Sequence, residues 1–175
     1  MIQDVESWRR LGKAAQQAQN AVSSAFCNHL RDSDPGRYAA LLDDFRAKTA
    51  AALPSTDPAF LPGVAANRVH YVDVAIAFLE ADPWFFRSGY EKQKIIRHLK
   101  RISLADPQRT RLAGIVLAAI DGRDRAEFRH FGRLACGIWC DFLDDGVATR
   151  MVSDDPGIRR RAVWVAEAAI SAGKA

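Results

Sequence analysis

The chain has 175 residues, of which 49% are hydrophobic and 26% are charged, and its formal net charge is +4. This composition is typical of one globular domain spanning residues 1–175 and excludes a disordered or low-complexity chain. The acidic start and the lack of a bilayer-length apolar stretch predict a cytoplasmic protein without a membrane segment. The three cysteines, an odd number without a secretion signal, are expected to be free thiols.

Positive charge is concentrated in the middle of the chain. Residues 87–133 contain 12 Lys and Arg against 5 Asp and Glu, which gives a net charge of +7. Residues 1–86 carry a net charge of −2, and residues 134–175 carry −1. Such a block bears on partners and association rather than on fold. An anionic partner is therefore expected to bind residues 87–133.

Five Asp-Pro pairs divide the chain at nearly even intervals; their aspartates are residues 34, 57, 82, 106 and 155. Aspartate caps the free N–H groups of a first helical turn, and proline suits the next position because its φ is already helical. Most of these pairs are therefore predicted helix starts. No stretch alternates with period two, so we predict an all-α fold of about seven antiparallel helices. A compact helical bundle and a short HEAT-like helical stack both fit.

The first helix is predicted over residues 4–30, with apolar residues spaced by three and four. Residues 14–30 carry no formal charge, which is unusual for an exposed helix. This helix either packs within the monomer or forms a homodimer interface in an oligomeric scaffold. The second helix follows Asp34-Pro35 and ends before Pro54, and a proline-rich loop leads to the third.

The third helix, predicted over residues 63–81, is apolar nearly all round and is the candidate central helix. Its polar residues His70, Asp73 and Glu80 form one narrow stripe. The stripe is either the solvated edge of a buried helix or a histidine–carboxylate pair. In the second case, His70 and Asp73 would serve a small-molecule binder or a small enzyme.

The remaining chain predicts four more helices after an aromatic connector at residues 84–87. The fourth begins near Gly89 with a capping box at Ser88 and Glu91. The fifth begins at Asp106-Pro107 and ends at Gly122, which is a good residue just past a helix end. The sixth has a second box at residues 124–127 and continues to about residue 146. The seventh begins at Asp155-Pro156.

Two of these helices carry cations on one ridge. Arginines spaced by four lie on one helix face, and like charges there repel by a few tenths of a kcal/mol per pair unless acids or a bound anion intervene. Two such ridges beside exposed aromatic rings would suit phosphates and a stacked, unpaired base. The predicted nucleic-acid or anion-binding residues are Lys94, Arg97, Arg101, Arg125, Arg129 and Arg133, with Trp84 and Phe85 as stacking rings.

Other interpretations of these charges are also open. The basic face is equally consistent with ordinary solvated surface balanced by acids from other helices. Arg159, Arg160 and Arg161 oppose the dipole of the last helix. They are either neutralised by Asp154 and Asp155 or belong to the basic surface.

Recognisable metal and catalytic motifs are lacking. Glu127-x-x-His130 has the spacing of a di-iron helix, but such a site needs a second motif and two further glutamates. Cys136 and Cys140 share a helix face without a zinc-type partner pair, so we interpret them as buried thiols. No nucleophile, Walker or dinucleotide motif is present, and neither metal nor cofactor is predicted. The leading hypothesis is a non-catalytic binding module for nucleic acid or an acidic protein, with a basic helical surface at residues 87–133.

Overall fold

The computed structural model describes residues 4–173, which are all-helical with no strand. The helices are α1 (Val5–Cys27), α2 (Leu30–Ser33), α3 (Pro35–Ala51), η1 (Pro54–Thr56, a 3₁₀ turn), α4 (Phe60–Ala65), α5 (Val69–Ala81), α6 (Ser88–Leu99), α7 (Asp106–Asp121), α8 (Phe128–Ile138), α9 (Asp141–Met151) and α10 (Pro156–Ser171). No helix in this part of the chain is long and apolar enough to cross a membrane.

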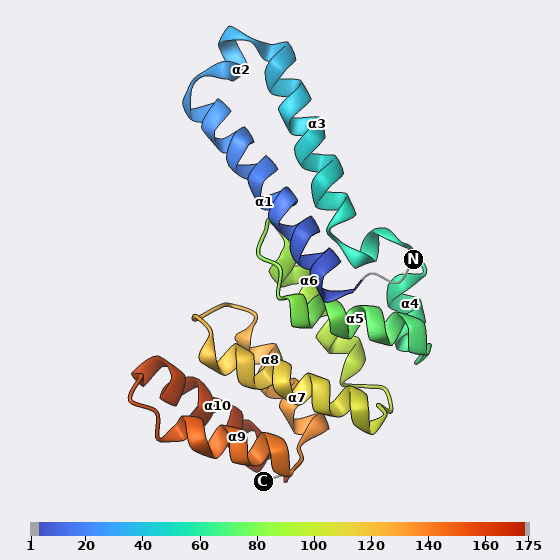
Figure 1. Ribbon diagram of the computed structural model, residues 1–175, viewed down its shortest axis with the longest axis vertical. Helices are drawn as coiled ribbons and strands as arrows, with labels where there is room; N and C mark the ends of the chain where they lie inside the picture. Colours follow the sequence, from blue (N-terminus) through green and yellow to red (C-terminus); the bar gives the residue numbers. More distant parts are fainter. Residues whose placement is uncertain (1–3, 174–175) are drawn as a thin grey trace.

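The helices after α4 stack in two rows. In one row α5 contacts α7, and α7 contacts α9; in the other α6 contacts α8, and α8 contacts α10. The rows are joined because α7 packs on α8 and α9 packs on α10. This arrangement places α8 between α6 and α10 (Figure 1).

The helices α1, α2 and α3 form an arm that projects from the stack (Figure 1). α1 and α3 are antiparallel neighbours, and α1 also contacts α5 at the base of the arm. There the ring of Trp8 meets Phe78 edge-on at 5.3 Å. Toward the tip the arm buries little beyond alanine, and Phe26 remains 58% exposed.

The apolar core runs continuously from the base of the arm to α10. α5 is buried along most of its length, as its nearly all-round apolar sequence predicted. The core residues of α7 include Leu112, Val116 and Ile120, which face α8, α9 and α10. The predicted seams of these helices are confirmed as buried faces.

The structure has ten α-helices in its described residues instead of about seven because two predicted helices are divided and α2 is additional. The predicted third helix breaks at Asn67, whose positive φ of 54° ends α4. Asparagine is one of the few residues that tolerates this conformation. The predicted sixth helix breaks at Trp139 and Cys140, which have extended backbone. No proline or glycine marks that break in the sequence.

The predicted helix starts at the Asp-Pro pairs of residues 34, 106 and 155 are confirmed, and the one at residue 82 is wrong. Asp34 and Asp155 accept hydrogen bonds from first-turn N–H groups of α3 and α10. Asp82 instead ends α5 with a φ of 45°. Asp106 is the first residue of α7, and the backbone N–H of Ala105 donates to Gln108.

Both predicted capping boxes are wrong. The Ser88 hydroxyl accepts from the backbone N–H of Phe85, upstream of the helix. The Glu91 carboxylate accepts from the N–H and hydroxyl of Ser55, both at 2.8 Å, and so anchors η1 to α6. Asp124 is not a helix cap either, because α8 begins four residues later.

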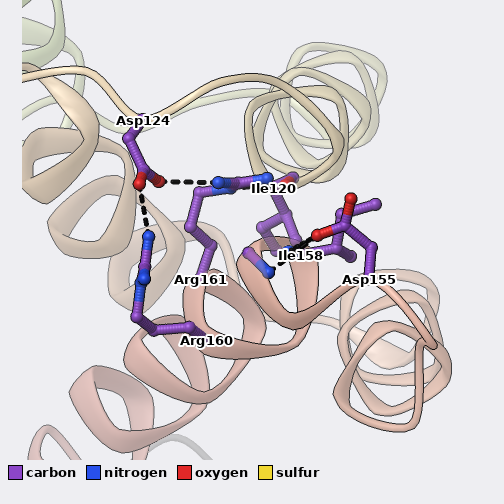
Figure 2. A network of polar contacts seen from close by, with 7 residues as sticks. Ile120, Asp124, Asp155, Ile158, Arg160 and Arg161 are labelled. Atoms are coloured by element: carbon purple, nitrogen blue, oxygen red, sulfur yellow. Dashed lines mark hydrogen bonds and ion pairs between the residues drawn. The ribbon is translucent and has the colours of Figure 1, made fainter.

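The arginines at the start of α10 are bound within the molecule (Figure 2). Arg161 is buried and donates to the Ile120 carbonyl at 2.7 Å and to Asp124 at 2.6 Å. Arg160 donates to the other oxygen of Asp124, and Arg159 donates to the Ser153 carbonyl. Arg160 and Arg161 thus tie α10 to the end of α7 and the α7–α8 connection. The carboxylate that pairs with them is Asp124, and not Asp154 or Asp155.

Candidate functional site

The exposed ridge of α8 carries two arginines. α8 buries Phe131, Leu134 and Ile138 in the core, which leaves Arg129 and Arg133 on its outer side. Residues four apart lie one above the other on a helix, so the two guanidinium groups form one ridge. α8 packs between α6 and α10, and we call the surface formed by these three helices the α6–α8–α10 face. The ridge lies at its centre.

The end of α6 brings two further cations to this ridge. Arg97 lies in the last turn of α6, and Lys100 is its C-cap. All four side chains are exposed, and none forms an ion pair within the described residues. We call Arg97, Lys100, Arg129 and Arg133 the basic cluster.

The buried imidazole of His130 lies within the field of the whole basic cluster. Burial lowers the pKa of His130, and the charges of Arg129, Arg133, Arg97 and Lys100 lower it further. Its Nε2 has no hydrogen-bond partner in residues 4–173. The cations of α6 and of α8 thus act on the same imidazole.

On its other side, α8 borders a groove of about 410 Å³ against α10. Trp164 of α10 is 51% exposed and lines this α8–α10 groove together with Arg129 and Arg133. A Cβ on Gly132, which also lines the groove, would meet no atom within 4 Å, so the space above it is open. The remaining lining residues are Arg125, Ala126, Phe128 and Ala168.

The Trp164 ring is held between two neighbours. Its centroid lies 6.3 Å from that of Phe128, in a tilted arrangement. The guanidinium carbon of Arg160 lies 5.6 Å from the ring, within the range of a cation–π contact. Arg160 is itself fixed by Asp124. The indole is therefore positioned, while half of its surface faces solvent.

The structure separates the other predicted cations from this face or binds them elsewhere. Lys94 lies 3.5 Å from the buried carboxylate of Glu91. Arg101 is exposed beyond the end of α6 and forms no ion pair with the residues that the structure describes. Arg125 precedes α8, is largely buried and donates to Asp82 at 2.6 Å. The predicted ridge of three arginines is thus a ridge of two.

The two predicted stacking rings do not reach the α8–α10 groove. Phe85 is 5% exposed and packs with Ala15 and Ala52, so it offers no ring face to a base. Trp84 is half exposed, but Arg123 covers its ring at 3.6 Å. Trp84 lines a separate hollow beside α1.

Two of the three residues of the polar stripe of the predicted third helix, His70 and Asp73, do not line a pocket, whereas Glu80 borders a cavity beside α7. His70 is exposed at the start of α5, and its ring lies beside Tyr71. Asp73 accepts a hydrogen bond from Gln108 at 3.1 Å. Neither His70 nor Asp73 lines any main cavity in the described part of the chain.

In residues 4–173, no three His, Cys, Asp or Glu side chains lie together in a group that could hold a metal ion. Cys136 donates to the carbonyls of Gly132 and Ala168, both at 3.3 Å, so it links α8 to α10 beneath the groove. Cys27 is exposed near the tip of the arm.

The sequence analysis missed Lys100 and Trp164. Lys100 lies three residues after Arg97, so the same helical spacing could have included it. Trp164 lies four residues after Arg160, which places the indole and guanidinium on one helix face. No local signal shows that α10 packs against α8, because that contact joins residues over 30 positions apart.

Comparison of this chain with known protein families, with curated proteins and with solved structures finds no match.

Proposed function

We propose that this protein is a non-catalytic binding module whose α6–α8–α10 face binds single-stranded nucleic acid. The observation that carries the proposal is the pairing of Arg129 and Arg133 with the exposed ring of Trp164 across one open groove. Single strands are bound by cations along the phosphates and by aromatic rings under the bases. The two-row stacking of the helices supports the short HEAT-like stack, which presents such a face along one row.

The charge of the face favours a polyanion. Each guanidinium of the basic cluster supplies forked donors to phosphate oxygens. None of the four cations is neutralised by a carboxylate in the described residues, so binding an anion relieves their mutual repulsion. An acidic protein would satisfy the charges equally well, but a flat base would also stack on the exposed ring of Trp164.

Fluorescence anisotropy with labelled single-stranded RNA and DNA across a salt series tests this proposal. Contacts by all four cations predict a slope of log K against log salt of about −3. Changing Arg129 and Arg133 together to alanine should reduce the slope by about 1.4. The matched control changes Arg31 and Arg37 to alanine, which removes the same charge from exposed, unpaired positions on the arm.

The stacking role is tested by Trp164→Leu, with Trp84→Leu as its control. The two indoles are equally exposed, at 51% and 52%. Loss of a stacked base costs about 1–3 kcal/mol, so Trp164→Leu should weaken binding at least fivefold and Trp84→Leu much less. Polyglutamate distinguishes the acidic-protein alternative. If polyglutamate binds as tightly as the oligonucleotide, and equally well to Trp164→Leu, nucleic acid is rejected as the ligand.

A second candidate function is self-association through the arm. Its basis is separate: residues 14–30 carry no charge, although α1 and α3 project from the stack without a third helix over them (Figure 1). A two-fold interface sets the same surface against itself, so a charge-free surface avoids repulsion. Seventeen residues span ~25 Å and the two helices α1 and α3 together ~20 Å, which gives two copies about 1,000 Å² in total. That is near the lower limit for a stable interface. Only the α1 half of this surface is free of charge, and α3 carries the ion pairs Arg46–Asp43 and Lys48–Asp44.

Light scattering over a range of protein concentrations tests this association. Ala21→Lys places a charge on the exposed side of α1 and should shift a dimer to monomer. Ala148→Lys, on the exposed side of α9, is the matched control and should leave the mass unchanged. A concentration-independent monomer mass for the unmodified chain would exclude the arm as a dimer interface.

A further inference from the structure

A cavity of about 350 Å³ lies between α5, α7 and α9, apart from the basic cluster. Its walls are mainly apolar and include Leu79, Ile115, Ala118, Phe131 and Phe142. The volume falls within the range of small-molecule sites, about 300–1,000 Å³, whose walls are likewise mostly apolar. Phe142, at the start of α9, is 54% exposed and lines this cavity.

The cavity is open because α7 presents small residues to it. Gly114 lines the cavity, and a Cβ at this position would meet no atom within 4 Å. Ala118, one helical turn further along, continues the same flank. Two buried apolar neighbours of α7, Leu112 and Val116, point into the core instead. Glycine and alanine at positions 114 and 118 thus preserve a space that larger side chains would fill.

Two arginines border this cavity, and their hydrogen bonding differs. Arg111 forms a bidentate pair with Glu80, with bonds of 2.9 Å from Nε and 2.6 Å from Nη2. Arg125, 14% exposed, hydrogen bonds in the described residues only through Nη1, to Asp82 at 2.6 Å. A guanidinium has five N–H donors, so both arginines keep unused donors, and Arg125 keeps more of them. Arg111 has a carboxylate that binds it at two atoms, whereas the single bond of Arg125 leaves its other donors beside the apolar walls.

The charges around Arg125 favour an acceptor on the ligand. Oδ1 of Asp82 is shared between Arg125 and the fully buried Lys92, each at 2.6 Å. Glu127 brings a second carboxylate, but its Oε1 lies 4.0 Å from Arg125, too far for a hydrogen bond. Two cations thus share one hydrogen-bonded carboxylate, with Glu127 as a second counter-charge beyond hydrogen-bond distance. An acidic group on the ligand would supply the second hydrogen-bonded acceptor.

We propose that this cavity binds a small amphipathic acid, with its apolar body against α7 and Phe142 and its carboxylate or comparable acidic group at Arg125. The ligand class follows from two features that coincide here: an apolar space of small-molecule size and a mostly buried guanidinium with unused donors. This site is independent of the α8–α10 groove, although Arg125 borders both.

Calorimetric titration of the full-length chain with decanoate, decanol and decylamine tests the proposal, because the three probes share one tail. Decanoate should bind at least tenfold more tightly than decanol, and decylamine should bind most weakly. Arg125→Gln should reduce decanoate binding to the level of decanol without changing decanol. Equal affinities for decanoate and decylamine would overturn the acid preference.

Filling the cavity gives an independent test. Gly114→Leu should abolish binding of both decanoate and decanol, while Gly137→Leu should not. Gly137 is the matched control because it also lies in a helix, has no atom within 4 Å of an added Cβ, and lines none of the described cavities. Ala118→Leu is a second filling variant at an exposed position of α7, should Gly114→Leu fold poorly. Undiminished decanoate binding in a folded filling variant would overturn the proposal.

The basic cluster provides the last control. Decanoate binding should survive the double change of Arg129 and Arg133 to alanine, and RNA binding should survive Gly114→Leu. Loss of decanoate binding in the double variant would place the acid on the α8 ridge and overturn the cavity site. These two readouts separate failure of this proposal from failure of the nucleic-acid proposal.

Discussion

The ammonium of Lys92, which has no exposed surface, lies 2.6 Å from Oδ1 of Asp82. Removing one partner of a buried pair costs about 3–5 kcal/mol, because the other charge is left without compensation. We therefore expect Asp82→Asn to lower the free energy of unfolding by about that amount. Asparagine tolerates the positive φ at this position, so backbone strain does not explain the loss. Urea denaturation measures it.

The matched change is Lys92→Met, which removes the buried charge and keeps an apolar chain of similar length. The partner that remains, Asp82, is 39% exposed, so this change leaves no buried charge without compensation. Asp82 keeps its bond to Arg125 in this variant. The expected change in unfolding free energy is within about 1 kcal/mol of zero. A larger loss for Lys92→Met than for Asp82→Asn would contradict this interpretation.

The buried imidazole of His130 predicts a loss of stability in acid. Burial, and then the charges of Arg129, Arg133, Arg97 and Lys100, lower its pKa in the folded state below the usual 6.5. The unfolded chain therefore binds a proton first as the pH falls through 6.5, and the proton favours unfolding. Urea denaturation at pH 7.5 and at pH 5.5 measures how much unfolding free energy is lost between the two. This loss should be smaller in His130→Phe than in the unmodified protein. An equal loss would exclude His130 as its source.

The same imidazole reports on the proposed ligand. A polyanion on the basic cluster would neutralise the charges that lower the pKa of His130. NMR titration of the His130 ring should therefore show a higher pKa in the presence of a single-stranded oligonucleotide. The Arg31 and Arg37 double variant should give the same rise, and the Arg129 and Arg133 double variant a smaller one. An unchanged pKa with bound oligonucleotide would place the ligand elsewhere.

Replacing two helical glycines by alanine, one at a time, should change the stability of the protein in opposite directions. A Cβ on Gly12 would lie 2.6 Å from Cβ of Pro83, so the arm and the stack would have to move apart. Such overpacking costs about 1–3 kcal/mol. A Cβ on Gly137 meets nothing, and alanine there should stabilise α8 by about 0.5–1 kcal/mol. Thermal unfolding of the two variants tests both signs. Equal effects would mean that the contact at Pro83 is not close.

Even a conservative substitution of Arg161 should lower the stability of the protein. Its fork joins the Ile120 carbonyl to Asp124 (Figure 2), and lysine cannot reproduce both bonds. Arg161→Lys should cost about 1–3 kcal/mol, because a buried acceptor loses its partner. The control is Arg159→Lys, two residues away and exposed, which should change stability by less than about 0.5 kcal/mol. Comparable losses in the two variants would argue against a structural role for the fork.

The sequence predicted those parts of the fold that depend on local chemistry. Asp34 and Asp155 cap helices as expected, and the apolar spacing of α5 and α7 identified buried faces. The break between α8 and α9 depends instead on extended backbone at Trp139, whose carbonyl accepts a hydrogen bond from Arg109. That partner lies 30 residues away, so no local pattern could indicate it.

The candidate site was predictable to the same extent. The spacing of Arg129 and Arg133 correctly placed them on one ridge, but it extended the helix back to Arg125, which lies before α8 begins. In the structure, Arg125 is largely buried and donates a hydrogen bond to Asp82. Trp164 joins the site through the packing of α10 on α8, which is a tertiary contact.

The arm meets the stack where Gly12 lies against Pro83 and Ala15 packs with Phe85. Cys27 is fifteen residues beyond Gly12, or about 22 Å along the helix. Rotation by about 10° at this base therefore moves the tip by about 4 Å, as a lever would. Pro83 directly follows Asp82, which borders the α5–α7–α9 cavity. If a change at Asp82 rotates this base, the movement is therefore largest at the tip of the arm, where a fluorescent label on the exposed Cys27 would detect it.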